Sequence, residues 1–264
     1  MTNKVIAMII GQNCEQTIEM CLESVKDADT IIYCDGGSTD GTLDYLDKKG
    51  FCWRVWKNNS WEVRTKSGNE VFVQDYGIII ENKWDPKDKQ MNGKQRNFYL
   101  DYLKKNYLNE WCIVLDADEV LEDFGIQKMR QFIDTQSEID NVLVSPRIHH
   151  FVGDLGHEDA TRELHYVPNR LFKITKTLSY PLGAHPVLKG AEKMGRIDIH
   201  IWHFRECLGV FNTNKKHIDN WKKSEMHSKG YLMWWYYTML FGSYPKKSVY
   251  YGDIPSPIKR RFEI

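Results

Sequence analysis

The stretch WCIVLDADE, residues 111–119, places two aspartates and a glutamate directly after five apolar residues. An unbroken apolar run of this length is typical of a strand that is covered on both faces of a parallel sheet. Asp116 and Asp118 are two positions apart, so their side chains point to the same side of an extended segment. Carboxylates this close repel one another unless a cation lies among them. The stretch therefore predicts a strand end that binds a cation, and a divalent ion with oxygen ligands, Mg²⁺ or Mn²⁺, suits it best.

The alternative is a solvated turn that starts a helix, because acidic residues are favoured in a first helical turn. Glu119 fits that role. The position of the acids nevertheless favours a ligand site, since two earlier apolar runs, 5–10 and 30–34, also end in polar loops. An amphipathic helical pattern separates these two runs. This βαβα opening predicts an α/β protein with a mainly parallel, Rossmann-like sheet flanked by helices, and ligands bind such sheets beyond the carboxyl ends of the strands.

The remainder of the chain predicts additions to that sheet. Residues 61–65 and 71–73 alternate in polarity around a turn, which indicates a β-hairpin insertion. Residues 95–108 are expected to form the helix before the LDADE strand. We place a ligand-binding and catalytic domain at 1–210 and a basic, aromatic-rich, mainly helical C-terminal extension at 211–264.

The charge of the chain is balanced overall but not locally. With 36 Lys and Arg against 36 Asp and Glu, the net charge is zero and no nucleic-acid partner is expected. Residues 215–264 hold ten basic and four acidic residues, a surplus of six positive charges, and residues 1–214 hold the opposite surplus. The favoured interpretation is that the extension packs on the rest of the protein or forms a homodimer. Contact with an anionic membrane surface, where Trp and Tyr suit the interface, is the alternative.

Cysteine usage and the N-terminus predict the compartment. The six cysteines form no C-x-x-C pair, and several lie in apolar runs, where Cys behaves as a small hydrophobic residue. The chain runs directly into a strand, with no pattern of a signal peptide. The longest strongly apolar run, 231–242, is too short to cross a bilayer as a helix. We expect a cytoplasmic protein, with peripheral attachment to a membrane left open.

The stretch DGGSTDGT, residues 35–42, follows the second predicted strand. Its glycines allow the backbone to approach a ligand closely, and Asp35 can accept hydrogen bonds from a base or a ribose. A tight turn that uses Gly, Asp and Ser for conformational reasons explains the stretch equally well. No G-x-G-x-x-G accompanies it, which argues against a nicotinamide or flavin domain.

Three segments, CLESVKDADTIIYCDGGSTDGT (21–42), GKQRN (93–97) and VLDADE (114–119), resemble glycosyltransferase family 2. The resemblance is strongest to the branch of that family that builds lipopolysaccharide and other surface glycans. It implies the GT-A fold and transfer of a sugar from a nucleotide diphosphate sugar, a UDP-sugar above all, to a glycan or glycolipid acceptor. It also implies Mn²⁺ or Mg²⁺ as cofactor and inversion at the anomeric carbon.

The family's metal and nucleotide positions carry over to the matching segments. The resemblance implies that Asp118 holds the metal, that Asp116 lies beside it near the ribose, and that His203 completes the metal site. Cys14 replaces an acid of the family's Asn-Glu-Glu loop, and Gly36 replaces a frequent Asp or Ser. The nucleotide-binding positions implied in this way are Asn13, Glu15, Asp35, Lys94, Arg96 and Asp116.

The catalytic base is where the chain departs from the family. Gly-Ala-His-Pro at 183–186 resembles a segment in which the family has His-Glu, and Pro186 cannot take a proton. Residues 170–172 resemble the family's Arg-Leu-Phe strand. His149 and His150 are interpreted as a loop pair without metal-binding spacing. The remaining candidates for the catalytic base are Asp159, Glu158, Glu163 and His185.

Two other functions remain open. A sugar nucleotidyltransferase shares a similar sheet and acids, but it usually carries a Gly-rich, basic loop after the first strand, which the GQNC of residues 11–14 lacks. A nucleotide-binding module without turnover, acting as a scaffold, is consistent with the missing glutamate. Release of pyrophosphate would identify the first, and metal-dependent hydrolysis of a nucleotide sugar would exclude the second.

Overall fold

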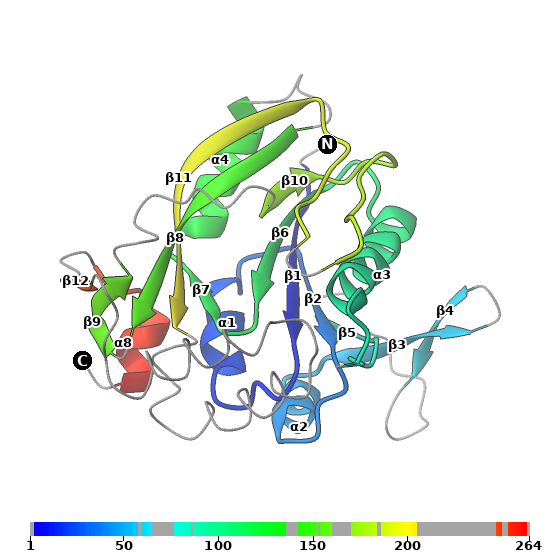
Figure 1. Ribbon diagram of the computed structural model, residues 1–264, viewed down its shortest axis with the longest axis horizontal. Coiled ribbons are helices and arrows are strands. Elements are labelled where there is room, and N and C mark those ends of the chain that lie inside the picture. Colours follow the sequence, from blue (N-terminus) through cyan, green and yellow to red (C-terminus); the bar gives the residue numbers. More distant parts are fainter. Residues whose placement is uncertain are drawn as a thin grey trace.

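The computed structural model describes residues 3–57, 60–64, 77–85, 87–135, 142–152, 154–159, 170–183, 186–204, 247–249 and 253–262. Within these ranges the chain forms one mixed sheet of twelve strands with helices on both faces (Figure 1). In chain order the elements are β1 (Val5–Gly11), α1 (Ile18–Ser24), β2 (Thr30–Asp35), α2 (Thr42–Lys48), β3 (Cys52–Lys57), β4 (Ser60–Arg64), β5 (Gly77–Glu81), α3 (Met91–Asn106), β6 (Trp111–Asp116), β7 (Glu119–Leu121), α4 (Gly125–Thr135), β8 (Val142–Val152), β9 (Asp154–Asp159), β10 (Leu171–Lys173), β11 (Lys193–Phe204), β12 (Lys247–Val249) and α8 (Ser256–Phe262).

The centre of the sheet is parallel and runs in the order β6, β1, β2, β5, β3. Its strands are apolar at nearly every position because successive side chains point to opposite faces, and both faces are covered. In β1, Val5 and Ile9 enter one hydrophobic core, while Ile6 and Met8 enter the other. The Rossmann-like α/β architecture predicted from the sequence is confirmed.

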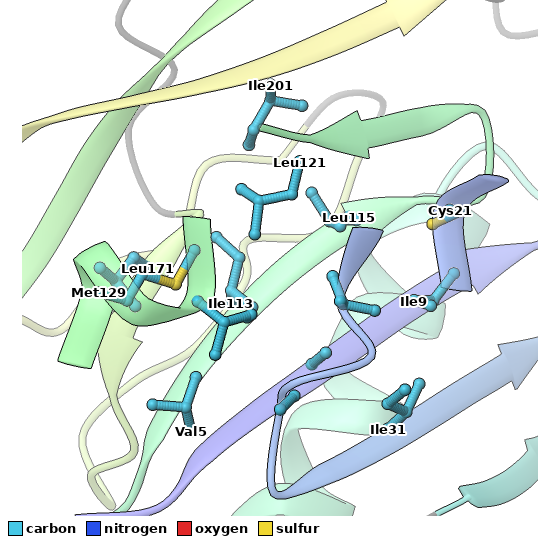
Figure 2. Packing of buried hydrophobic residues seen from close by; sticks show 14 of the residues in the cluster. Val5, Ile9, Cys21, Ile31, Ile113, Leu115, Leu121, Met129, Leu171 and Ile201 are labelled. Atoms are coloured by element: carbon cyan, nitrogen blue, oxygen red, sulfur yellow. The ribbon is translucent and has the colours of Figure 1, made fainter. Parts of the chain in front are cut away.

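The helices divide between the two faces. α1, α2 and α4 contribute Cys21, Leu46 and Met129 to the core that also contains Val5, and Figure 2 shows Cys21 and Met129 packed against β1 and β6. α3 covers the opposite face through Tyr99 and its neighbours. The expected helix at 95–108 therefore exists, but it begins earlier, at Met91.

The strand order reverses between β1 and β6. From β1 the chain winds outward through β2 to β3, β4 and β5, and it then crosses back to place β6 on the other side of β1. In open α/β sheets, ligands bind at such a reversal, beyond the carboxyl ends of the strands. Both LDADE and the loop after β1 lie at this edge.

The other half of the sheet is built from long-range pairings. β10 lies antiparallel between β6 and β8, and β11 pairs with β8 on one side and with β7 on the other. Glu119 starts β7, not the helix that the alternative interpretation of the acids expected. His149 and His150 lie within β8, so the interpretation as a loop pair was wrong.

Two further expectations meet the structure in part. The strand at 60–64 belongs to a β-hairpin, but its antiparallel partner is β3, which precedes it, and residues 71–73 lie outside the described residues.

Two elements of the C-terminal extension are described. β12 pairs with β9, and α8 buries Ile258 against Met20 and Trp202. These parts pack on the rest of the protein; the domain boundary at 210 stays a prediction. None of the helices in the described ranges is long and apolar enough to cross a membrane.

Candidate functional site

Three central strands bring their carboxyl ends to the same level. Ile10, next to the last residue of β1, is in register with Cys34 of β2 on one side and with Asp116 of β6 on the other. Asp35 pairs with Gly11. A Cβ atom at Gly11 would lie 2.7 Å from the Cβ of Ala117, so only glycine allows LDADE to approach β1 this closely. The loops after β1, β2 and β6 thus form one polar edge.

Asp35 is fully buried and organises the loop after β2. Its Oδ2 accepts hydrogen bonds from the backbone N–H groups of Gly37 (2.8 Å) and Ser38 (2.9 Å), and its Oδ1 accepts one from the Ser38 hydroxyl (2.5 Å). Three bonds from its own loop make Asp35 an internal anchor for residues 36–38. The predicted contact with a base or ribose is not tested by these bonds and stays a prediction.

The loop after β1 is tied to the loop after β2 by reciprocal hydrogen bonds. Asn13, whose φ of 56° is left-handed, accepts the N–H of Thr39 at 2.7 Å and donates its own N–H to Ser38 Oγ at 2.9 Å. The N–H of Glu15 donates to Asp40 at 3.2 Å. The predicted nucleotide residues Asn13, Glu15 and Asp35 therefore belong to one interlaced pair of loops.

The acids of LDADE are paired with two arginines. Arg96 of α3 lies 3.3 Å from Oδ1 of Asp116, and Arg170, just before β10, lies 3.4 Å from its Oδ2. Arg170 also contacts Oε1 of Glu119 at 2.5 Å, and the N–H of Asp116 donates to Oε2 of Glu119 at 2.8 Å. The cation that the sequence demands is therefore supplied in part by guanidinium groups.

The electrostatics of this cluster favour ionised Asp116. Burial alone would raise the pKa of Asp116, but Arg170 and Arg96 outweigh it and hold the pKa well below its usual range. Burial, and then the charge of Asp116, raise the pKa of Glu119 above its usual range in spite of Arg170. The Arg96 side chain is 18% exposed and that of Arg170 is 11% exposed. Arg96 is therefore the arginine that a ligand reaches more easily.

Asp118 faces His203, the residue that the resemblance implies as a further metal ligand; that the two bind a metal stays a prediction. Its Oδ1 lies 3.6 Å from Nε2 of His203 on β11, and both side chains are mostly buried. The other ring nitrogen of His203, Nδ1, lies 2.9 Å from Nδ1 of His150 on β8. An N···O distance of 3.6 Å is too long for a hydrogen bond. Two such atoms are, however, close enough to share one divalent ion, whose bonds to N and O are roughly 2.0–2.2 Å long.

Asp118 and His203 fit a divalent ion whose coordination shell is completed by water and by oxygens of a bound phosphate. No group of three or more His, Cys, Asp and Glu side chains placed to hold a metal occurs in the part of the chain that the structure describes. One carboxylate and one imidazole leave positions for water and phosphate oxygens, as Mg²⁺ and Mn²⁺ sites at phosphates commonly do. Asp116, predicted as a second ligand, is engaged by the two arginines.

The remaining predicted residues are placed unevenly. Lys94 pairs with Asp88 at 2.6 Å, and its side chain is half exposed. Oε1 of Glu158 lies 2.6 Å from Nδ1 of His149. Asp159 ends β9, and nothing is described of its side chain. Glu163 and His185 lie outside the described residues.

The roles of two residues of the site are not recognisable from the sequence. Arg170 belongs to the Arg-Leu-Phe segment, but no local pattern indicates that β10 pairs with β6. His150 meets His203 only because β8 and β11 pair, 53 residues apart. The glycine of GKQRN is likewise explained by a long-range contact, because a Cβ at Gly93 would lie 2.5 Å from the carbonyl oxygen of Pro181.

Comparisons with known proteins give only distant likenesses. No family model matches the chain, and no curated protein matches it. A crystal structure of S. aureus TarS 1–349 shares 12% identity over 83% of this chain and 70% of its own, with a TM-score of 0.48. The same fragment in complex with UDP shares 11% over 87% and 68%, also with a TM-score of 0.48. GalNAc-T7 with UDP, GalNAc and Mn²⁺ shares 14% over 99% and 54%, with a TM-score of 0.43. At these identities and TM-scores the likenesses carry no conclusion about function.

Proposed function

We propose that the chain is a glycosyltransferase of the GT-A type that uses a nucleotide diphosphate sugar, with a UDP-sugar as the first donor to test. The observation that carries the proposal is the meeting of Arg96, Arg170 and the Asp118–His203 pair beyond the carboxyl ends of the strands where the sheet order reverses. A diphosphate carries charge that needs cations on more than one side. This edge offers guanidinium groups and a pair of metal-ligating side chains together.

The residues would divide the work as follows. Asp118 and His203 would hold Mn²⁺ or Mg²⁺, which when bound neutralises the diphosphate leaving group as a Lewis acid. Arg96, the more exposed arginine, would bind a phosphate oxygen. Asp116 orients Arg96 and Arg170 through its two oxygens, which explains a carboxylate next to a phosphate site.

The interlaced loops after β1 and β2 would form the nucleoside side of the site. Asp35 fixes the backbone at Gly37 and Ser38, and Asn13 fixes Thr39. Such fixed loops present their remaining groups to a ligand without an additional ordering cost. We therefore propose that Asn13, Glu15 and Asp35 define the base and ribose pocket, with Lys94 at its edge.

The acceptor is proposed to be a glycan or glycolipid of the surface-glycan class, with inversion at the anomeric carbon. Inversion needs a group that takes the proton from the attacking hydroxyl. Glu158, Asp159 and His185 are the proposed candidates for this base. Glu158 contacts the ring of His149, which lies on the face of β8 opposite to His150 and His203. A cytoplasmic enzyme, attached to a membrane surface or paired through its basic extension, is the corresponding cellular setting.

The proposal is tested by turnover. Purified protein is incubated with Mn²⁺ and a panel of nucleotide sugars, and release of the nucleoside diphosphate is measured with and without glycan acceptors. We expect release from one donor class and at least a 100-fold loss in Asp118→Ala. Asp134→Ala, which removes an exposed acid from α4, is the matched control. Near-normal release by Asp118→Ala would contradict the proposal. Pyrophosphate release from a nucleoside triphosphate and a sugar phosphate would replace it with a nucleotidyltransferase.

A further inference from the structure

Three side chains lie next to one another across the strands β8, β11 and β7. His203 of β11 is in register with His150 of β8 on one side and with Glu119 of β7 on the other. Directly opposed residues of neighbouring strands share a face of the sheet. Ile148 and Ile201, two positions before these histidines, enter the same hydrophobic core. The row His150–His203–Glu119 therefore lies on one face, and it ends beside Asp118.

Both ring nitrogens of His203 are directed at partners in this row. Nδ1 lies 2.9 Å from Nδ1 of His150, and Nε2 lies 3.6 Å from Oδ1 of Asp118. The two imidazole rings stand at 89° to each other, with centroids 5.0 Å apart. A contact of 2.9 Å between two nitrogens needs one proton between them, because two lone pairs at that distance repel.

The position of that proton decides what His203 can do. A neutral imidazole has one N–H, and the other nitrogen carries the lone pair that binds a metal. If Nδ1 of His203 donates to His150, the lone pair of Nε2 points toward Asp118. If the proton sits on Nε2 instead, the ring cannot ligate an ion there, and Asp118 is too far away to accept a hydrogen bond.

We propose that His150 is a positioning residue that accepts the Nδ1–H of His203 and thereby fixes Nε2 as the metal-ligating atom beside Asp118. This inference rests on the proposed function. Metal-ligating histidines almost always donate their other N–H to an outer partner, usually a carboxylate, carbonyl or water. In this chain an imidazole takes that place, and the pairing of β8 with β11 supplies it.

The neighbouring residue provides a matched control. His149 lies on the opposite face of β8, because successive strand residues alternate. There it contacts Glu158 through Nδ1 and His200 through Nε2, both at 2.6 Å. Replacing His149 removes a histidine from the same strand without touching the row that contains His203.

The experiment measures Mn²⁺ binding, not turnover. Free Mn²⁺ is titrated by electron paramagnetic resonance in the presence of UDP at a concentration that saturates the parent protein. His150→Phe keeps a ring but removes the acceptor, whereas His150→Asn places an amide oxygen close to the position of Nδ1. We expect the Mn²⁺ Kd to rise about 10- to 100-fold in His150→Phe. The Kd should stay within a few-fold of the parent in His150→Asn and be unchanged in His149→Phe.

The outcomes separate this inference from the function on which it rests. If Asp118→Asn loses Mn²⁺ while His150→Phe binds it within twofold of the parent, the role of His150 is overturned and the metal site stands. If Asp118→Asn binds Mn²⁺ as the parent does, the metal site itself is overturned. Equal weakening in His150→Asn and His150→Phe would also overturn the role of an acceptor. Should His150→Phe fail to fold, His150→Val, with a side chain suited to strands, gives the same comparison.

Discussion

Two loop regions at the same edge of the sheet use their polar residues in different ways. In the loops after β1 and β2, Asp35 and Asn13 accept hydrogen bonds from residues of the same two loops. In LDADE, Asp116 and Glu119 are balanced by Arg96 and Arg170, which come from distant parts of the chain. Hydrogen bonds within the loops after β1 and β2 fix the backbone of those loops. In LDADE the balancing charges come from elsewhere in the chain, and the proposed site uses these same arginines.

The largest effect on stability is expected when an arginine that balances the acids of LDADE is removed. Arg170→Met leaves Glu119 and part of Asp116 as buried acids without their guanidinium partner. Removing one member of a buried ion pair costs about 3–5 kcal/mol. Urea unfolding of the parent and the variant measures this cost. Arg170→Met in a Glu119→Gln background should cost clearly less; an equal cost would show that the two side chains are not coupled.

A smaller effect is expected where the self-satisfied loop is weakened. Asp35→Asn keeps the size of the side chain but removes the charge that strengthens three hydrogen bonds from Gly37 and Ser38. We expect a loss of about 1.5–3 kcal/mol of unfolding free energy. Asp47→Asn, at an exposed acid on α2, is the control and should stay within about 0.5 kcal/mol. An unchanged stability in Asp35→Asn would mean that the loop does not depend on this anchor.

The link between the two loops is tested at Asn13. Asn13→Ala removes the group that accepts the N–H of Thr39, and it also places alanine at a left-handed φ of 56°, which is unfavourable for that residue. Asn13→Gly removes the same acceptor without this conformational cost. We expect Asn13→Ala to be less stable than Asn13→Gly by about 1 kcal/mol. Thermal melts of both variants measure the difference. Equal melting temperatures would contradict a strained left-handed residue at this position.

The smallest effect concerns pH. Burial, followed by the neighbouring His149, lowers the pKa of His200, although Glu122 and Asp198 oppose the shift. A base with a lowered pKa in the folded state takes up its proton mainly on unfolding, so stability falls as the pH drops through about 6.5. The unfolding free energy of the parent relative to that of His200→Gln should therefore rise between pH 5.5 and 7.5. Identical slopes in the two proteins would exclude this contribution.

The fold could be predicted because each central strand is a continuous apolar run that can be recognised from its own few residues. The apolar runs that became β1, β2 and β6 need cover on both faces, and the loops that follow them supply polar strand ends. The partner of the strand at 60–64 could not be predicted, because its alternating pattern suits either neighbour. Pairing of β8, β10 and β11 joins segments with no shared local signal.

In the site, too, local patterns indicate some residues, whereas long-range strand pairing brings in others. Asp116 and Asp118 lie at and just after the end of β6, as their place after an apolar run predicts, and Asp118 lies 3.6 Å from His203; that this pair binds a metal stays a prediction. The cation at Asp116 was expected to be a metal, and the structure shows that arginines also serve. Arg170 and His150 reach the site through long-range strand pairing, so a reading of residues along the chain does not reveal them.

The central claim is that LDADE and β11 form a divalent-metal site for a nucleotide diphosphate. Isothermal titration of UDP into the parent and into Asp118→Asn, each with and without Mn²⁺, tests it most directly. The account predicts that Mn²⁺ tightens UDP binding by the parent at least tenfold and has no effect on the affinity of Asp118→Asn. UDP binding that is indifferent to Mn²⁺ in the parent, or equally strengthened by Mn²⁺ in the variant, would contradict the account.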